Sequence, residues 1–584
     1  MNTRDKLTAA KTTLRRVWAL TTPYFSSSEK WKARGLLAAI VLLNLAAVYM
    51  LVLMNEWNRL FYNALEKRDQ AVFWAQLLRF SYLAFGYIVI AVYKFYLTQL
   101  LEMRWRAWMT RHYLQRWLSG QAFYRMELAR YSGANDTPDN PDQRIQEDLN
   151  LFTTYSISLS MGVLNAVVTL LSFVGILWSL SGGFAFSLGG SEYVVPGFMV
   201  WAAVAYCVVG SVITHYIGRP QIPLNFRQQR LEADFRHHMV RVREYSEAIA
   251  LDKGEQVEGG HLARRFSSLL GNYLRLIRAQ KNLIWFTNFF GQAAIIFPFL
   301  VAAPRFFSGA IQLGELMQIS SAFGNVQDSL AWFVDNYSSL ATWRATTDRL
   351  TSFEESMSAQ DQAARPEVAR GGEALATDAL TLALPNGSVL LSNVSLQVVP
   401  GDSVIVKGPS GSGKSTLFRA FAGIWPFAQG KVQIPADTMC IPQNPYFPDG
   451  SLRDALAYPE PADRYSEDEL RAALDAALLP QLTARLDDQD AWTQKLSGGE
   501  RQRLALARVF LKQPAWVLAD EATSALDEAA ETTLYQRLAA MVRRRGGALI
   551  SIGHRPALDA FHRHRWQLQR PSDDSTAAFE LQKA

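Results

Sequence analysis

The chain has 584 residues, of which 49% are hydrophobic and 12% aromatic, and a formal net charge of +6. Since single domains usually hold about 100 to 200 residues, we expect at least two. A mean hydropathy near zero argues against a wholly soluble chain and against a wholly embedded one. Lysine and arginine flank apolar runs instead of forming one basic stripe, so we expect membrane topology and no nucleic-acid partner.

Five stretches of the first half are long and apolar enough to cross a bilayer, whose core of about 30 Å needs about 20 helical residues. They are residues 36–54, 77–97, 161–181, 198–217 and 283–301. Residues 311–337 form a sixth, more polar candidate, which contains Gln318, Ser320, Ser321, Asn325, Gln327, Asp328 and Ser329. Polar residues in a span usually face the bundle interior or a watery cavity. We therefore expect a sixth span that lines a solute path; a cytoplasmic amphipathic helix is the alternative.

Positive charges orient these spans, because short cytoplasmic segments carry excess lysine and arginine. Residues 1–34, 98–160 and 218–282 are rich in both, whereas the loop 182–196 has neither. We therefore place both termini in the cytoplasm and this loop outside. The first residues lack the apolar core and cleavage site of a secretory signal. The two long inward stretches keep a helical period, which predicts helices that continue beyond the membrane.

The second half has a different composition. Residues 352–375 lack a strong apolar period, as expected of a connector. Over residues 376–584, short β-type runs alternate with helical ones, which predicts an α/β core with a largely parallel sheet. The predicted organisation is a membrane domain over residues 1–351, a linker over 352–375 and an α/β domain over 376–584.

A glycine-rich segment follows the predicted strand 403–406 and opens a helix. It reads Gly408, Pro409, Ser410, Gly411, Ser412, Gly413, Lys414, Ser415 and Thr416. This is the pattern of a P-loop, in which backbone N–H groups and a helix N-terminus hold phosphate. Lys414 would meet the outer phosphates, and Ser415 would offer an oxygen to Mg²⁺. We therefore expect ATP and Mg²⁺ as cofactors, and a cytoplasmic ATP site requires the sixth crossing.

Two carboxylates follow the apolar run 515–519, at the carboxyl end of a predicted buried strand. Ligands bind at that end of the strands in α/β sheets. Asp520 can hold Mg²⁺ through water, and Glu521 is placed to polarise the attacking water as general base. After a P-loop, this pair predicts a complete hydrolytic site.

Residues 496–503 form a second potential phosphate-binding helix N-terminus, because the small residues Ser497, Gly498 and Gly499 open a predicted helix. This segment resembles the signature sequence of the ABC ATPases. The family's other motifs follow in order. Gln443 resembles the Q-loop glutamine, which implies a catalytic role and a place among the Mg²⁺ ligands.

Two further motifs complete the resemblance to ABC ATPases. Residues 524–527 resemble the D-loop and end at Asp527, and His554 resembles the switch histidine. The resemblance implies a six-span α-helical bundle of the type IV ABC exporter-like fold, followed by an α/β P-loop ATPase domain. It also implies that the P-loop of one chain and the Ser497 loop of another enclose each ATP. With one membrane domain and one ATPase domain per chain, a homodimer is the simplest assembly.

Residues 417–426, 442–453 and 553–556 resemble the SbmA/BacA-related half-transporters and their peroxisomal acyl-CoA cousins, as do 140–148 and 215–220 in the membrane half. This resemblance implies ATP-driven import of bulky hydrophilic solutes across a bacterial inner membrane: peptides, bleomycin-like glycopeptides or cobalamin. Many ABC exporters stack adenine on an aromatic side chain before the P-loop, but residues 382–387 contain none. We expect apolar contacts to hold the base.

Three other functions remain open. An exporter of amphipathic compounds would share the order of membrane and ATPase domains, and an ATP-regulated channel or scaffold would not perform active transport. An acyl-CoA carrier would need basic residues in its cavity, and only Lys94 and Arg305 lie near the clear spans. We expect Lys94 to extend to the membrane interface instead. Residues 140–148 and 225–235 are the expected coupling segments.

Overall fold

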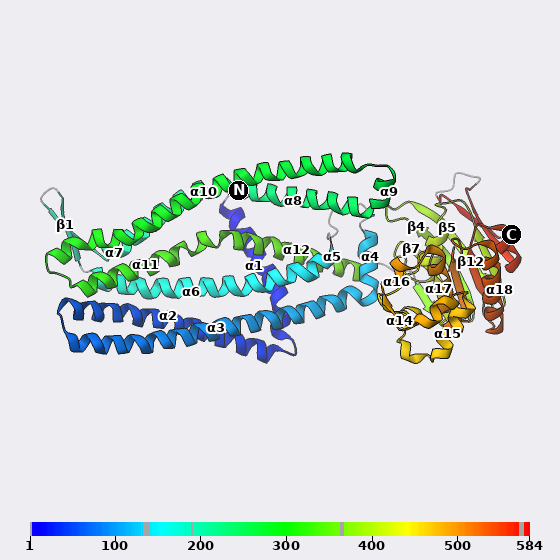
Figure 1. Cartoon of the computed structure of the whole chain (residues 1–584), viewed down its shortest axis with the longest axis horizontal. Coiled ribbons are helices and arrows are strands. Elements are labelled where there is room, and N and C mark those ends of the chain that lie inside the picture. Colours follow the sequence, from blue (N-terminus) through cyan, green and yellow to red (C-terminus); the bar gives the residue numbers. More distant parts are fainter. Residues whose placement is uncertain are drawn as a thin grey trace. The chain divides into compact units, whose positions relative to one another are not determined.

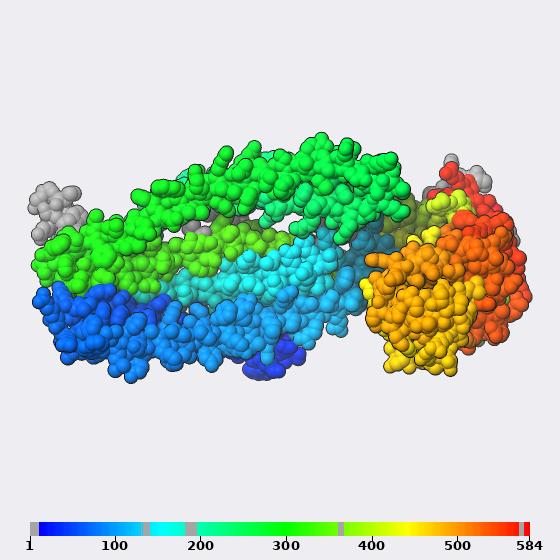
Figure 2. Space-filling model, viewed as in Figure 1, coloured from blue at the N-terminus to red at the C-terminus, as the bar shows by residue number. Residues whose placement is uncertain are grey.

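The computed structural model describes residues 3–129, 131, 140–181, 183–188, 191–362, 367–571 and 577–583. The chain divides into two compact units, which Figure 1 shows as long helices and as a mixed α/β body, and which Figure 2 shows in space-filling form. The first, the helical unit, comprises Met1–Tyr113 and Asn140–Thr351. The second, the α/β unit, comprises Leu114–Asp139 and Ser352–Ala584. The chain therefore passes between the units three times.

Helices, most of them long, make up the helical unit. They are α1 (Thr3–Ser26), α2 (Lys30–Glu66), α3 (Gln70–Leu118), α5 (Pro141–Gln143), α6 (Leu149–Ser181), α7 (Phe198–Gly218), α8 (Gln221–Glu244), α9 (Ser246–Leu251), α10 (Glu255–Phe307), α11 (Leu313–Asp335) and α12 (Tyr337–Gln362). Within the described residues, five helical stretches are long and apolar enough to cross a membrane, and they contain the five clear spans that we predicted. The loop expected at residues 182–196 contains an antiparallel hairpin, β1 (Gly183–Leu188) and β2 (Ser191–Pro196).

The more polar sixth candidate is the helix α11, which packs against α2, α6 and α7. Its apolar face, including Phe323 and Val326, is buried in the bundle core. Of the seven polar residues expected to line a solute path, Gln318 and Ser329 are instead buried. The Ser329 hydroxyl donates to the Asn325 carbonyl within the helix, 2.7 Å away. Part of this polarity therefore serves helix packing.

The two long basic stretches are largely helical over their described residues, as predicted. The helices α8 and α10 pack side by side. A buried amide pair joins them, because Asn272 Nδ2 donates to Gln228 Oε1 at 2.9 Å. The short helix α9 connects them.

The predicted linker 352–375 is not an irregular connector. The helix α12 runs through its first half to Gln362, and β3 (Glu367–Arg370) and the start of β4 (Leu375–Ala383) occupy its second half. The reason is a helical stripe: Leu350, Phe353 and Met357 are each at most 1% exposed and recur at the spacing of one helix face. The polar residues between them hid this stripe from the sequence analysis.

The α/β unit contains the parallel sheet that alternation predicted. Its six strands run in the order β14-β13-β6-β12-β11-β8, and all pairings except β13 with β14 are parallel. These strands are β6 (Ser403–Lys407), β8 (Thr438–Ile441), β11 (Trp516–Asp520), β12 (Leu549–Ile552), β13 (His564–Gln569) and β14 (Glu580–Lys583). A second sheet has the order β3-β7-β4-β5, with β5 (Val389–Val398) and β7 (Ala428–Ile434).

Helices flank these sheets. They are α13 (Lys414–Phe421), α14 (Leu452–Ala457), α15 (Glu467–Ala476), α16 (Trp492–Lys495), α17 (Gly498–Lys512) and α18 (Glu528–Arg544), with a small strand pair β9 (Gly450–Ser451) and β10 (Gln489–Asp490). The helix α4 (Ala122–Ala129) comes from the first half of the chain but belongs to this unit, because Leu128 packs against its core.

Replacing Phe353 by alanine tests whether α12 continues as a packed helix beyond Thr351. The side chain is fully buried, so Phe353→Ala should destabilise the protein by about 3 to 5 kcal/mol. Thermal unfolding of the purified full chain measures the change. Glu355→Ala, on the exposed side of the same turn, is the matched control and should change little; equal stability of both variants would contradict a packed helix.

We expect His562 to make the α/β unit sensitive to acid. Its Nδ1–H donates to the Leu558 carbonyl at 2.8 Å, and its Nε2 accepts from the Ser551 hydroxyl at 2.9 Å. Burial lowers the pKa of this imidazole. The folded protein therefore favours neutral His562, and its contribution to stability is present above the unfolded pKa and is lost as pH falls through the lower folded pKa.

We accordingly expect the melting temperature to fall between about pH 7 and about pH 5, where the unfolded histidine of pKa near 6.5 takes up its proton. Melting curves of the wild type and His562→Gln across this range provide the test. The glutamine variant should be less stable at neutral pH and should show a shallower pH dependence. Parallel curves for the two proteins would exclude this role of His562.

Candidate ATP hydrolysis site

The predicted P-loop joins β6 to α13, as its sequence indicated. Gly413 caps the helix with a φ of 90°, a left-handed conformation that favours glycine. At Gly408 a Cβ atom would lie 2.8 Å from the Leu568 carbonyl oxygen, so the backbone runs too close for any side chain. The loop is thus a cradle of bare backbone in front of a helix N-terminus, which suits a phosphate group.

Two side chains of this loop fit a bound nucleotide. Lys414 Nζ folds back and donates to the carbonyls of Gly408 and Pro409, at 2.8 and 3.0 Å. Burial lowers the pKa of Lys414, which the negative charges of Glu521 and Asp520 oppose. The Ser412 hydroxyl is buried without a hydrogen-bond partner. A phosphate would supply the missing negative charge for this ammonium group.

The two predicted Mg²⁺ ligands nearest the P-loop lie together. The Ser415 hydroxyl donates to Asp520 Oδ1 at 3.1 Å, and Asp520 ends the buried strand β11. Burial raises the pKa of Asp520, and the hydrogen bond from Ser415 lowers it. Among the described residues, no cluster of three His, Cys, Asp or Glu side chains is arranged to hold a metal alone. Mg²⁺ bound here would need phosphate oxygens and water as further ligands, which is its usual coordination.

Glu521 is the best-positioned base. It has a φ of 49°, which is strained for a residue other than glycine and places its side chain at the end of the sheet. Gln443 Nε2 donates to Glu521 Oε2 at 2.8 Å. His554 Nε2 lies 3.3 Å from Glu521 Oε1. The structure therefore brings together the three predicted catalytic residues, with one carboxylate oxygen facing the amide and the other facing the imidazole.

The signature loop has a different environment. The Ser497 hydroxyl accepts from the Glu500 N–H, and the Glu500 carboxylate accepts from the Ser497 N–H, which closes a capping box at the start of α17. Gly498 and Gly499 open the helix. None of these residues lines the cavity that contains Ser415 and Asp520, or the cavity that contains Glu521 and His554. Asp527 caps α18 in the same way, by accepting from the Ala530 N–H at 2.8 Å.

Two residues that the sequence analysis missed hold the D-loop segment 524–527. Buried Gln502 of α17 donates to the Ser524 hydroxyl and accepts from the Ala525 N–H. Arg555 donates to the carbonyls of Leu526 and Ser524. The only sequence features that could have indicated them are the position of Gln502 inside the signature segment and that of Arg555 directly after His554.

A cavity of about 310 Å³ adjoins the Mg²⁺ side of this site. Ser415, Gln443 and Asp520 line it, together with Tyr124 from α4. Burial raises the pKa of the Tyr124 phenol. A segment from the first half of the chain, α4, therefore adjoins this cavity within the α/β unit. The expected coupling segments 140–148 and 225–235 belong to the helical unit, and their role stays a prediction. The sequence pattern that could have predicted the place of α4 is weak, because this helix spans only eight residues.

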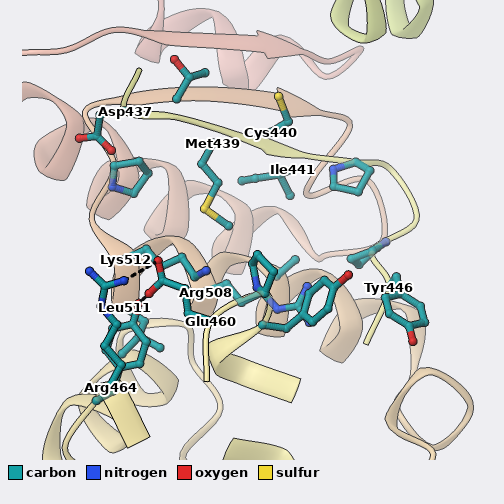
Figure 3. A pocket seen from close by; sticks show the side chains of 18 of the residues that line it. Asp437, Met439, Cys440, Ile441, Tyr446, Glu460, Arg464, Arg508, Leu511 and Lys512 are labelled. Atoms are coloured by element: carbon teal, nitrogen blue, oxygen red, sulfur yellow. Dashed lines mark hydrogen bonds and ion pairs between the residues drawn. The ribbon is translucent and has the colours of Figure 1, made fainter. Parts of the chain in front are cut away.

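A larger cavity of about 730 Å³ lies along the edge strand β8 (Figure 3). Cys440, Ile441 and Pro442 line both cavities, so the two are neighbours. The Arg508 guanidinium, which is buried, donates to the Ala455 carbonyl. In Figure 3 it lies with Lys512, Arg464 and Glu460 on the side facing β8. No sequence pattern predicted this cavity.

Comparison with known families agrees with the motifs. Residues 20–307 match the model described as ABC transporter transmembrane region 2, and residues 391–524 match the model described as ABC transporter. The chain is 34% identical to the inner membrane ABC transporter ATP-binding protein YddA of Escherichia coli, over 90% of this chain and 92% of the relative.

Two eukaryotic relatives belong to the D family. The chloroplastic ABC transporter D family member 2 of Arabidopsis thaliana is 33% identical, over 96% of this chain and 86% of the relative. The human lysosomal cobalamin transporter ABCD4 is 28% identical, over 81% and 82%. In fold, the chain is similar to a bacterial Atm1-family ABC exporter solved with ATP bound, with a TM-score of 0.69, 18% identity, and coverage of 93% and 94%.

Replacing Glu521 by glutamine keeps the shape of the side chain and removes the predicted base. Because a positioned general base typically contributes a factor of about 10² to 10⁴, ATP hydrolysis should fall at least about 100-fold. ATP binding, which depends on the P-loop, should remain. Phosphate release and nucleotide binding by the purified chain give the two readouts. Glu528→Gln, at an exposed acid just beyond the D-loop, should leave both unchanged; a Glu521→Gln protein that still turns over would assign the base elsewhere.

Proposed function

We propose that this chain, which belongs to the ABC transporter family and is related to its D-family half-transporters, acts as a homodimer that imports bulky hydrophilic solutes across a bacterial inner membrane. The ATPase coupled to transport follows from the family. The main observation in favour of active, ATP-driven transport is the position of Glu521, which is held between Gln443 and His554 next to the P-loop. A channel or scaffold that only binds ATP would not need this arrangement.

Dimerisation is supported by the separation of the two phosphate-binding loops within one chain. The described cavities beside the P-loop and beside Glu521 include no residue of the Ser497 loop. A second copy would bring its own Ser497 loop to the P-loop of the first, and symmetry would make two equal sites. The N–H groups of Gly498 and Gly499 at the start of α17 would then face the phosphates.

The hydrogen bonds of two basic residues argue against an acyl-CoA substrate. Lys94, which we expected to extend to the membrane interface, donates its Nζ to Asn44 Oδ1 at 3.0 Å. Arg305 donates to the carbonyls of Leu180 and Ser181, the last residues of α6, at 3.3 and 2.6 Å. Both cations satisfy polar groups of the protein. Neither is left to bind the phosphates of a coenzyme.

Hydrophilic solutes are supported by the helix α11 and by one relative. Asn325, Gln327 and Asp328 of α11 are not buried in the bundle, so polar side chains remain to line a path. The human relative is named as a cobalamin transporter. Cobalamin, like a glycopeptide, is large and polar. An exporter of amphipathic compounds would instead favour an apolar lining.

The inner membrane of a bacterium is supported by the Escherichia coli relative, which is named as an inner membrane protein. An α/β unit that hydrolyses ATP has to face the cytoplasm. With six crossings, this places both termini there as well, in agreement with the basic residues before α2. Tyr124 of α4, which lines the 310 Å³ cavity together with Gln443, is the proposed point of coupling between the ATP site and the helices.

Transport in proteoliposomes tests direction and solute together. Vesicles with the α/β units outside are preloaded with labelled cobalamin or a labelled cationic peptide, and ATP and Mg²⁺ are added outside. We expect the wild type to release the solute from the lumen and Glu521→Gln to release none. Accumulation of external solute would show an exporter, and leakage equal in both proteins would show a channel.

A further inference from the structure

A buried carboxylate near the passage between the two units is held by two arginines. The Asp148 side chain is only 1% exposed. Its Oδ2 accepts from Arg144 NH1 at 2.8 Å and from Arg349 Nε at 3.0 Å, and its Oδ1 accepts from Arg349 NH2 at 2.5 Å. Charge-assisted and bidentate pairs of this kind are the strongest and most directional hydrogen bonds of side chains. The hydrogen bonds that Arg349 donates to Asp148 also raise the pKa of Arg349.

These residues occupy special places along the chain. Asp148 ends a π-helical turn, Arg144–Asp148, that leads into α6. That turn follows Asn140, where the chain re-enters the helical unit. Arg349 stands in α12 just before Thr351, where the chain leaves the helical unit for the last time. The Asp148–Arg349 pair therefore links the point where the chain re-enters the helical unit to the point where it leaves that unit for the last time.

A second ion pair does the same for the first passage. The chain first leaves the helical unit after Tyr113. Beyond this point, Arg116 of α3 pairs with Glu354 of α12 and its NH2 also donates to the Ser358 hydroxyl at 3.4 Å. Both partners belong to the α/β unit. All three passages are thus joined to α12, two of them through arginine and carboxylate side chains.

We infer that Asp148, with Arg144 and Arg349, is a positioning group that makes α6 and α12 move as one body. Closure of the ATPase domains would then move the membrane helices as well, and would not be taken up by movement of α12 alone. The inference rests on the proposed ATP-driven cycle. The physical reason is the burial of the carboxylate. Sliding α12 past α6 would leave a buried charge without partners, which is strongly unfavourable.

The neighbouring pair on α12 shows the contrast. Arg16 NH1 contacts Asp348 Oδ1 at 2.7 Å, but the two side chains are 40% and 41% exposed. Water can replace each partner there, and exposed pairs contribute little. A charge pair on the same turn of the same helix is therefore a matched control for the buried one.

The experiment follows the opening of the bundle without any solute. Cys207 and Cys440 are the two cysteines of the chain and are replaced by alanine and serine. A reporter thiol is introduced on α11 as Asp328→Cys, at an exposed position. The reconstituted full chain is labelled with a membrane-impermeant maleimide, with and without ATP and Mg²⁺. The same preparations are assayed for ATP hydrolysis and thermal stability.

In the parent protein, ATP should change the labelling rate by about tenfold, the range of typical coupling between sites. Arg349→Gln should hydrolyse ATP within about twofold of the parent yet lose the ATP-dependent change. Arg349→Lys, which keeps the charge but replaces the guanidinium fork with a single nitrogen, should recover part of it. Arg16→Gln should behave as the parent. Asp148→Asn should match Arg349→Gln, and its stability shows whether it still folds.

Each outcome bears on a different claim. A parent protein that hydrolyses ATP without any change in labelling overturns the proposed cycle and the inference with it. A parent that responds while Arg349→Gln responds equally overturns the inference alone. Loss of hydrolysis and of labelling change in the same proportion in Arg349→Gln would show a merely structural role and would also overturn it.

Discussion

The parallel ladder of β8, β11, β12 and β6 is the constraint on which the ATP site depends. Its register sets Asp520 opposite Ile552 and Ile552 opposite Val406, with Ala519 opposite Ile441. The carboxyl ends of four strands therefore meet at one edge of the sheet. The P-loop, Gln443, Glu521 and His554 each follow one of these ends within a few residues. Backbone hydrogen bonds between strands, and not contacts between the motifs, bring the chemistry together.

This dependence explains what the sequence could predict. Each motif stands directly after a buried strand, so a local pattern of apolar run, turn and functional side chain was enough to place Lys414, Asp520 and Glu521 in one site. The five apolar spans were equally local, since length and hydropathy determine them. The sixth helix needed a functional argument, because its polar residues lower its hydropathy although Phe323 and Val326 are buried in the bundle.

Long-range contacts were beyond the sequence. Tyr124 reaches the cavity of Gln443 across more than half of the chain, and nothing near residue 124 indicates a partner. Gln502 and Arg555 hold the D-loop through backbone carbonyls and N–H groups, which carry no residue-specific pattern. The predicted linker failed for another reason: three buried residues at helical spacing, Leu350, Phe353 and Met357, are too few to stand out among polar neighbours, yet they suffice to keep α12 packed.

Two cations near the predicted spans, Lys94 and Arg305, each donate to acceptors that the protein itself supplies. Lys94 meets an amide oxygen and Arg305 meets helix-terminal carbonyls, so both compensate polar groups that lipid would leave unsatisfied. Among the described side chains, Asp328 and Asp335 of α11 are exposed and form no salt bridge. A path along α11 would then present carboxylates and amides without matching cations. Such a lining favours neutral or cationic hydrophilic solutes over anionic ones, because an anion would meet repulsion with no compensating partner.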